Sequence, residues 1–501
     1  MTVISVHSFS DIGTLEMQLA DWTKGLGILS LTAVLSAAVA AQETEPTQDP
    51  EEPEVKKPAV VMKGRFDLLG LSGYGTGGRF GLTTFGRLTG FGHGSSFGTP
   101  VGFGKDLNIY QETALQLSSG EASKFKWSGT LVGSSVYGAF GSQSLPGAGG
   151  FTSGLWDGYL QDLWVSFDSM LLGNDYNVRF GRVGYQIGDF ILKKGDVTPA
   201  FANERWDNGD FHFDGGIVGM PFGQAKLTVF GGWADPKTFG GRVLEPMIGG
   251  VVDELLGVEL TAPIGDNGKL KAAYLMQDSD QMLGGANRVN TYGAEFKINS
   301  GQISFGGKYS KTVLSRNTHT VNDTNNAAWD VDMGYRFNKT RALLGFRRVE
   351  SAFLAAGSWD RIGHIWNPTG FDEFRVGAEY EAADKLDFDV NVRMIKGLPS
   401  IGNLNMTTGD KCLSLRLGAR YEFSPRSAAV ARIETYNFNY KVGNDPNAAW
   451  LILGWEGDAG KDASVRFYYE TGGADDRGAV NNLFGGKFSG GQLAIQYSLK
   501  F

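Results

Sequence analysis

From about residue 65 onward the chain repeats one pattern, in which roughly ten residues alternate between apolar and polar side chains before a turn. In residues 385–394, KLDFDVNVRM, every second residue from Leu386 to Met394 is apolar, and Asp, Asn and Arg fill the gaps. Successive side chains of a strand point to opposite faces, so each such segment predicts a strand with one apolar and one polar face. Both a two-layer sandwich and a closed barrel satisfy this pattern.

The lengths of the connections separate these two folds. Very short links join some predicted strands, as at 299–301 and 423–426, whereas long segments such as 234–253 and 351–370 separate the resulting hairpins. Short and long connections alternate through the C-terminal half. A transmembrane barrel has tight turns at one rim and long loops at the other, which a sandwich does not require. Connection length therefore favours a barrel.

Aromatic residues support a membrane barrel because they gather at the predicted strand ends, as Tyr421 and Phe423 do. Amphipathic rings are favoured at the two bilayer interfaces. The expected fold is all-β: a transmembrane antiparallel up-and-down β-barrel of about 18–20 strands that spans residues 64–501. A barrel of that size is wide enough to enclose water.

The residues before the barrel predict export and a linker. Lys24 precedes an apolar run that closes on Ala38-Val39-Ala40, which is typical of a secretory signal peptide at residues 1–40, with Met17 as an alternative start. A membrane anchor is the other interpretation, but the run is shorter than the ~20 residues that a spanning helix needs. Residues 41–63 are acidic and rich in proline, which indicates a flexible periplasmic linker.

Composition excludes several classes of function. The net charge of −8 argues against a nucleic-acid-binding protein, which needs a basic surface. A lone Cys412 cannot form an internal disulfide. Glycine-rich matches to nucleotide or esterase motifs lack the strand-to-helix context that gives them meaning. The histidines have no metal-ligand spacing, so neither a metal nor a cofactor is expected.

The last residues, GQLAIQYSLKF, end the chain on an alternating strand with a terminal aromatic. With the signal peptide, this pattern resembles the porins, outer-membrane barrel proteins of diderm bacteria. The resemblance implies that the barrel-assembly machinery reads the alternate residues of the last strand as an assembly signal. The matching residues are Leu493, Ile495, Tyr497, Leu499 and Phe501.

A narrower stretch is similar to the alginate-export type of porin. There, a strand with a Gly-Arg pair is followed by Gly-Asp, a loop bearing Arg and Trp, and Phe-Asp-Gly at the start of the next strand. The matching positions are Gly181, Arg182, Gly188, Asp189, Arg205, Phe213, Asp214 and Gly215, while Val183 stands where a glutamine is usual. The loop from Ile191 to Asp210 is the expected constriction, with Lys193, Lys194, Arg205 and Trp206 as its candidate residues.

Alternation also predicts which charged side chains line the pore. The expected pore-lining residues are Arg336, Arg375, Arg393, Arg416, Arg420, Arg432, Arg466, Asp330, Asp332, Glu379, Asp387, Asp389, Glu422, Glu434 and Glu470. Because the signs are mixed, these charges are expected mainly to solvate the lumen and to pair across strands. A preference for anions is the alternative.

The expected function is passive diffusion of small hydrophilic solutes through an outer-membrane channel, with no enzymatic step. An alginate-like conduit for acidic sugars or polysaccharide is the alternative within transport. A barrel-embedded hydrolase, with His93, His319 and His364 as its only candidate bases, and an adhesion barrel are the rivals from other classes. Expected partners are outer-membrane lipid, the assembly machinery and solutes, not nucleic acid; a homo-oligomer is left open.

Overall fold

A computed structural model places most of the predicted barrel. The residues it describes are 60–76, 108–120, 125–137, 156–171, 174–193, 209–234, 253–278, 287–316, 319–322, 324–362, 365–475, 477 and 487–501. The predicted signal peptide and most of the predicted linker lie outside these residues. Strand β1 begins at Val60, so residues 60–63, which the sequence assigns to the linker, belong to the barrel wall.

Within the described residues, twenty antiparallel strands form the wall. The first ten are β1 (Val60–Thr76), β2 (Asn108–Ser119), β3 (Lys126–Tyr137), β4 (Trp156–Leu171), β5 (Asn174–Tyr185), β6 (Phe211–Phe222), β7 (Ala225–Trp233), β8 (Glu254–Ile264), β9 (Gly268–Asp278) and β10 (Arg288–Ser300). The others are β11 (Ile303–Arg316), β13 (Ala327–Phe337), β14 (Thr340–Val349), β17 (Phe371–Ala383), β18 (Leu386–Gly397), β19 (Lys411–Ser424), β20 (Ser427–Asn439), β21 (Asn447–Asp458), β22 (Ala463–Asp475) and β23 (Phe488–Lys500).

Three short strands complete the described elements. β12 (His319–Asn322) pairs with the end of β11, and β15 (Arg361–Ile362) pairs with β16 (Ile365–Trp366) in a loop. Among the residues that the structure describes, no helix is long and apolar enough to cross a bilayer.

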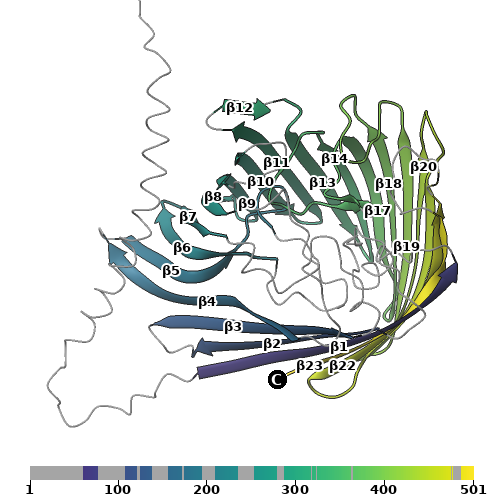
Figure 1. Cartoon of the computed structure of the whole chain (residues 1–501), viewed down its shortest axis with the longest axis horizontal. Coiled ribbons are helices and arrows are strands. Elements are labelled where there is room, and N and C mark those ends of the chain that lie inside the picture. The colour runs from purple at the N-terminus through teal and green to yellow at the C-terminus, as the bar shows by residue number, and fades with distance from the viewer. Residues whose placement is uncertain are drawn as a thin grey trace, which may run out of the picture.

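The wall closes where the two ends of the chain meet. Each strand pairs with its neighbour in sequence, and β1 pairs with both β2 and β23 (Figure 1). Arg65 lies opposite Lys500, and Gly64 and Phe501 exchange two backbone hydrogen bonds of 2.6 and 3.0 Å. The prediction of a closed up-and-down barrel is confirmed, and its strand number is the upper value of the expected range.

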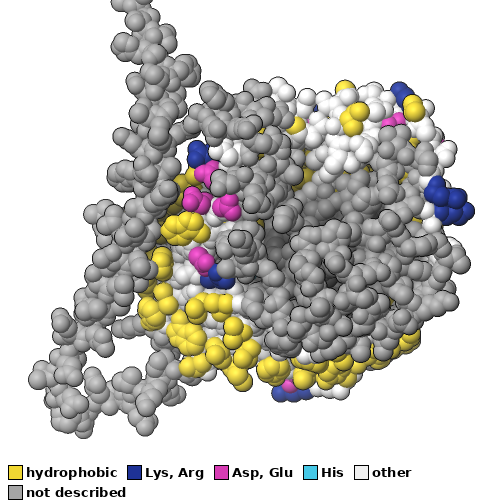
Figure 2. Space-filling view, in the orientation of Figure 1, with side chains coloured by type: hydrophobic (Ala, Val, Ile, Leu, Met, Phe, Trp, Pro, Cys, Tyr) yellow, Lys and Arg dark blue, Asp and Glu magenta, His cyan; other side chains and the backbone are white. Residues whose placement is uncertain are grey.

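The outer face of the wall is apolar and exposed. On β13, for example, Met333 and Tyr335 are 41% and 42% exposed, whereas Asp330 on the other face is 5% exposed. Hydrophobic side chains gather along the outside of the wall in Figure 2. The inner face carries charged side chains, and where loop segments cover it the strands also contribute buried apolar side chains such as Phe213 and Tyr436, so burial here marks the inside of the barrel.

The connections alternate in length as the sequence predicts. Tight turns such as 338–339 lie at one rim, and loops such as 350–370 and 398–410 lie at the other. Asn338 and Gly301 adopt positive φ values of 49° and 57° in such turns. A two-residue hairpin favours this conformation, because its twist then matches that of the flanking strands.

Candidate functional site

Charged side chains of alternating sign form a continuous line across six neighbouring strands of the inner face. Each lies directly opposite the next in the strand register. We call this line the charge row, and its members are Lys271 on β9, Glu295 on β10, Lys308 on β11, Asp330 on β13, Arg347 on β14 and Glu373 on β17. Opposite charges at facing positions stabilise neighbouring strands.

Two loop segments are held against the charge row on its inner side. The first inward segment is residues 186–193, which follow β5, and the second inward segment is residues 350–362, which follow β14. In each segment, one aspartate forms ion pairs and one backbone carbonyl accepts a hydrogen bond. Their partners are lysines or arginines of the charge row or of a neighbouring strand.

The first inward segment is attached through Asp189. Its carboxylate pairs with Lys308 of the charge row and, at 2.8 Å, with Lys193 of the same segment. Lys271 donates a hydrogen bond to the carbonyl of Ile187 at 2.9 Å. Burial raises the pKa of the Asp189 carboxyl, but the ammonium groups of Lys308 and Lys193 outweigh burial and hold that pKa well below its usual range.

The second inward segment is attached through Asp360. Its carboxylate pairs with Arg347 at 3.2 Å and with Arg393 of β18. Arg347 also donates to the carbonyl of Trp359 at 3.2 Å, so one guanidinium holds two neighbouring residues of the segment. Arginine suits this role because its planar group presents several donors in a fixed geometry.

The arginines around Asp360 are themselves anchored to the wall. Arg393 pairs with Glu373 at 2.5 Å, and Arg375 pairs with Glu373 at 3.4 Å and with Asp330. The Glu373 side chain is fully buried. Breaking a buried pair leaves an uncompensated charge and costs about 3–5 kcal/mol, so the ends of this network are fixed in place.

Apolar packing joins the two inward segments to each other. The Phe190 ring of the first lies 5.8 Å from Phe353 and 6.0 Å from Trp359 of the second. Lys193 donates its backbone N–H to the carbonyl of Ala356 at 2.9 Å. Ion pairs and buried apolar side chains together hold both segments as one fixed narrowing of the lumen.

The contact between the segments requires a glycine. A Cβ atom on Gly357 would lie 1.9 Å from the carbonyl oxygen of Asp189, which is backbone and cannot rotate away. Glycine here permits an approach that any larger residue would prevent.

The predicted pore-lining residues lie on strands of the inner wall. Asp330, Arg375 and Arg393 belong to the network around Asp360. On β18 to β22 other predicted residues also pair across strands. Arg416 pairs with Asp389 of β18 at 3.4 Å, and Arg420 pairs with Glu456 of β21 at 2.7 Å and with Glu422 of its own strand at 3.6 Å. Glu379 of β17 pairs with Arg341 of β14 at 3.3 Å.

Those of the remaining predicted residues whose side chains are described occupy the same face. Glu434 accepts a hydrogen bond from Tyr436 at 2.8 Å, and Arg432 is 5% exposed. Asp387 lies opposite Arg420, and Arg466 lies opposite Glu456. Asp332 and Arg336 lie on the Asp330 face of β13, closer to the tight-turn rim. Glu470 lies on β22, and its side chain is outside the described part of the chain.

The expected constriction residues are placed only in part. Lys193 is described and pairs with Asp189, while Lys194, Arg205 and Trp206 lie outside the described residues. Sequence reasoning missed the second inward segment and its Asp360. One signal was available: residues 351–359, SAFLAAGSW, are unusually apolar for a loop, which indicates burial.

The stretch that resembles the alginate-export porins has an unexpected orientation. Arg182 and Asp214 lie opposite each other and form two hydrogen bonds of 2.7 and 2.6 Å. Asp214 also lies opposite Trp233, which is 48% exposed on the outer face. This pair therefore points away from the lumen and cannot touch a solute inside it.

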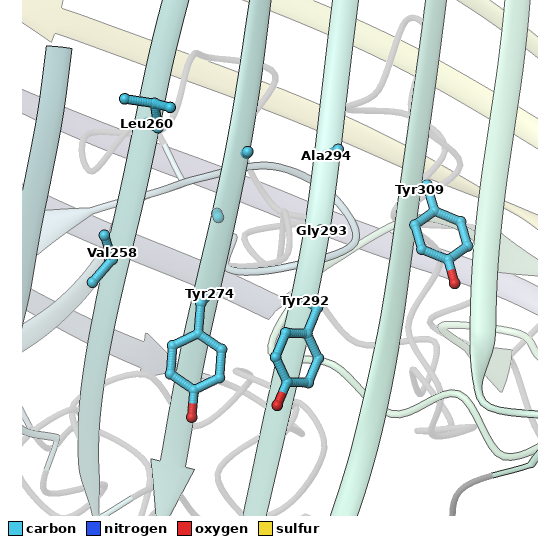
Figure 3. A pocket seen from close by; sticks show the side chains of 9 residues that line it. Val258, Leu260, Tyr274, Tyr292, Gly293, Ala294 and Tyr309 are labelled. Atoms are coloured by element: carbon cyan, nitrogen blue, oxygen red, sulfur yellow. The ribbon is translucent and has the colours of Figure 1, made fainter. Parts of the chain in front are cut away.

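A groove of about 420 Å³ lies on the outer wall across β8 to β11. Tyr274, Tyr292 and Tyr309 line it from neighbouring strands and point the same way (Figure 3). Because Tyr292 and Tyr309 are both 48% exposed on the outer face, the groove is not part of the lumen.

Among the described residues, no group of three His, Cys, Asp or Glu side chains could hold a metal ion. His212 is buried on β6, and His319 lies on β12. The other two barrel histidines, His93 and His364, lie outside the described residues.

Comparison with family models and with curated proteins finds no match. Solved structures similar in shape include the outer membrane protein OpdK of Pseudomonas aeruginosa, with 13% identity, a TM-score of 0.40, and coverage of 88% of this chain and 99% of that one. Another is OccAB2 of Acinetobacter baumannii, with 9% identity, a TM-score of 0.45, and coverage of 88% and 98%. Likeness at this level is too weak to support a function.

Proposed function

We propose that this protein is an outer-membrane channel through which small hydrophilic solutes diffuse passively. The closed twenty-stranded wall carries the proposal. Its exposed apolar outer face suits lipid, and closure pairs the backbone groups that hydrocarbon would otherwise leave unsatisfied at several kcal/mol each. Its inner face is charged, and walls of 16 to 18 strands already leave room for water.

The two inward segments set the width of the passage in this proposal. They narrow the lumen beside the charge row, and solutes also pass along the charged part of the inner wall on β18 to β21. Carboxylates and cations are both present along that route, as in the pairs of Asp389 with Arg416 and Glu456 with Arg420. Mixed charge favours polar solutes in general over one sign of ion.

Conductance of the purified chain in a planar bilayer tests the proposal. Stepwise, ohmic conductance in potassium chloride, with permeation of small sugars and a defined size limit, is the expected result. A folded barrel that inserts into the bilayer without conducting would contradict it.

The same measurement tests the alternative that the protein is a conduit for acidic sugars. Addition of alginate oligosaccharides would block the current in a concentration-dependent way if the lumen held such a substrate. We expect no block that neutral oligosaccharides of equal length do not also cause, because Arg182 and Asp214 face outward.

A further inference from the structure

Two lysines lie directly opposite each other on the outer face, at the rim that carries the long loops. Lys396 is the second-last residue of β18, and Lys411 opens β19. Met394, 40% exposed, shares the face of Lys396, and Leu413, 48% exposed, shares that of Lys411. Both ammonium groups therefore lie outside the barrel, and facing like charges destabilise a sheet unless an anion lies between them.

Nearby carboxylates are already engaged. Asp372 lies opposite Lys396, but its two oxygens accept hydrogen bonds from Arg348, both at 2.6 Å. Asp410 accepts from the backbone N–H groups of Lys441 and Thr407, at 2.8 and 2.7 Å. Neither Lys396 nor Lys411 forms an ion pair within the described part of the chain, so no carboxylate described there compensates their positive charge.

Apolar surface continues directly below the two lysines. Met394 and Leu413 lie opposite each other, and Phe374 of β17 lies opposite Met394. These side chains are one step of the alternation, about 7 Å along the strand, nearer the middle of the wall. Positive charge above exposed hydrocarbon matches a lipid, with its anionic headgroup at the rim and its chains on the wall.

We propose that Lys396 and Lys411 bind the phosphate headgroup of a membrane lipid whose acyl chains lie on Phe374, Met394 and Leu413. This site rests on the proposed function, because it requires the outer face to lie in a bilayer. A lipid is favoured over free phosphate since the apolar surface adjoins the lysines. Each basic residue at a membrane surface strengthens attraction to anionic lipid, so two facing lysines act together.

Lipid titration of the folded protein tests the site. The full chain is refolded in a neutral detergent and titrated with dioleoyl phosphatidic acid or with dioleoylglycerol, which lacks the phosphate, and bound lipid is counted by native mass spectrometry. We expect phosphatidic acid alone to bind, and the K396Q/K411Q variant to bind it about tenfold or more weakly. K396R/K411R, which keeps both charges, should retain binding.

The matched control is K385Q/K461Q, which removes two exposed lysines from the short-turn rim. It should bind phosphatidic acid as the unchanged protein does. Equal weakening in both double variants, or none in either, would overturn the proposal. Displacement of the lipid by millimolar inorganic phosphate would also overturn it, because the site would then recognise the free anion.

Conductance separates this site from the proposed function. Lys396 and Lys411 face away from the lumen, so K396Q/K411Q should conduct like the unchanged protein. Loss of conductance in this variant would place the lysines in the passage and refute the lipid site. A protein that binds phosphatidic acid without conducting would refute the channel and leave the lipid site standing.

Discussion

Asp360 attaches the second inward segment to two arginines of the wall. Replacement of Asp360 by Asn should leave one excess positive charge beside Arg347 and Arg393 and raise the preference of the channel for anions. Asp360 is only 11% exposed and faces two guanidinium groups, and we expect its loss to raise the chloride-to-potassium permeability ratio by roughly 2- to 5-fold, which corresponds to about 0.4–1 kcal/mol. Reversal potentials in a salt gradient measure this ratio. Asp384→Asn, in an exposed turn at the other rim, is the control; equal ratios in both variants would refute the role of Asp360.

Phe501 offers a second test at the scale of one residue. Its ring lies against Gly64, where an added Cβ would approach the ring to 2.2 Å, and its side chain is on the outer face. Phe501→Ala should therefore lower the yield of folded barrel without changing the conductance of each channel. Heat-modifiable electrophoretic mobility gives the yield, and Lys500→Ala is the control. Unchanged assembly would exclude Phe501 as an assembly signal.

Among the elements, the first inward segment should be insensitive to mild acid. In the folded protein the pKa of Asp189 lies below the ordinary carboxyl value of about 3.9. Its ion pairs therefore contribute their full stability above that ordinary value. This stability is lost only as pH falls through the lower pKa of the folded state. Channel conductance, corrected for bulk conductivity, should show no step from loss of this attachment between pH 7 and 5. Lys308→Met removes the main partner of Asp189 and should introduce such a step. A variant without the step would show that this pair does not hold the segment.

The strands could be predicted from the sequence, whereas the attachment of the inward segments could not. A strand can be recognised in a sequence because its apolar and polar side chains alternate with a period of two, as they do in β18 and β19. The ion pair of Asp360 with Arg393 joins residues 33 positions apart and follows no period. The outward orientation of Arg182 could not be predicted either, because glycines at 215–216 and 231–232 interrupt the alternation of apolar and polar side chains in the adjoining strands.

For the whole molecule, closure should depend on β1 and not on the residues before it. A chain of residues 60–501 keeps every described strand and should refold in detergent to a heat-modifiable barrel. A chain of residues 77–501 leaves β2 and β23 with unpaired edges and should fail to form that species. Far-UV circular dichroism and electrophoretic mobility distinguish these outcomes. Equal refolding of both chains would show that β1 is dispensable.

Because β1 and β23 pair in register, the wall has no intrinsic first strand. Gly64 and Phe501 already share two backbone hydrogen bonds, so the two ends of the wall are only a short peptide apart. A short linker could join them, and the chain could be opened instead at one of the long loops. Such a circular permutant would contain the same ring of strand pairs in a different order of synthesis. The order in which the strands are made is thus separable from the architecture they build.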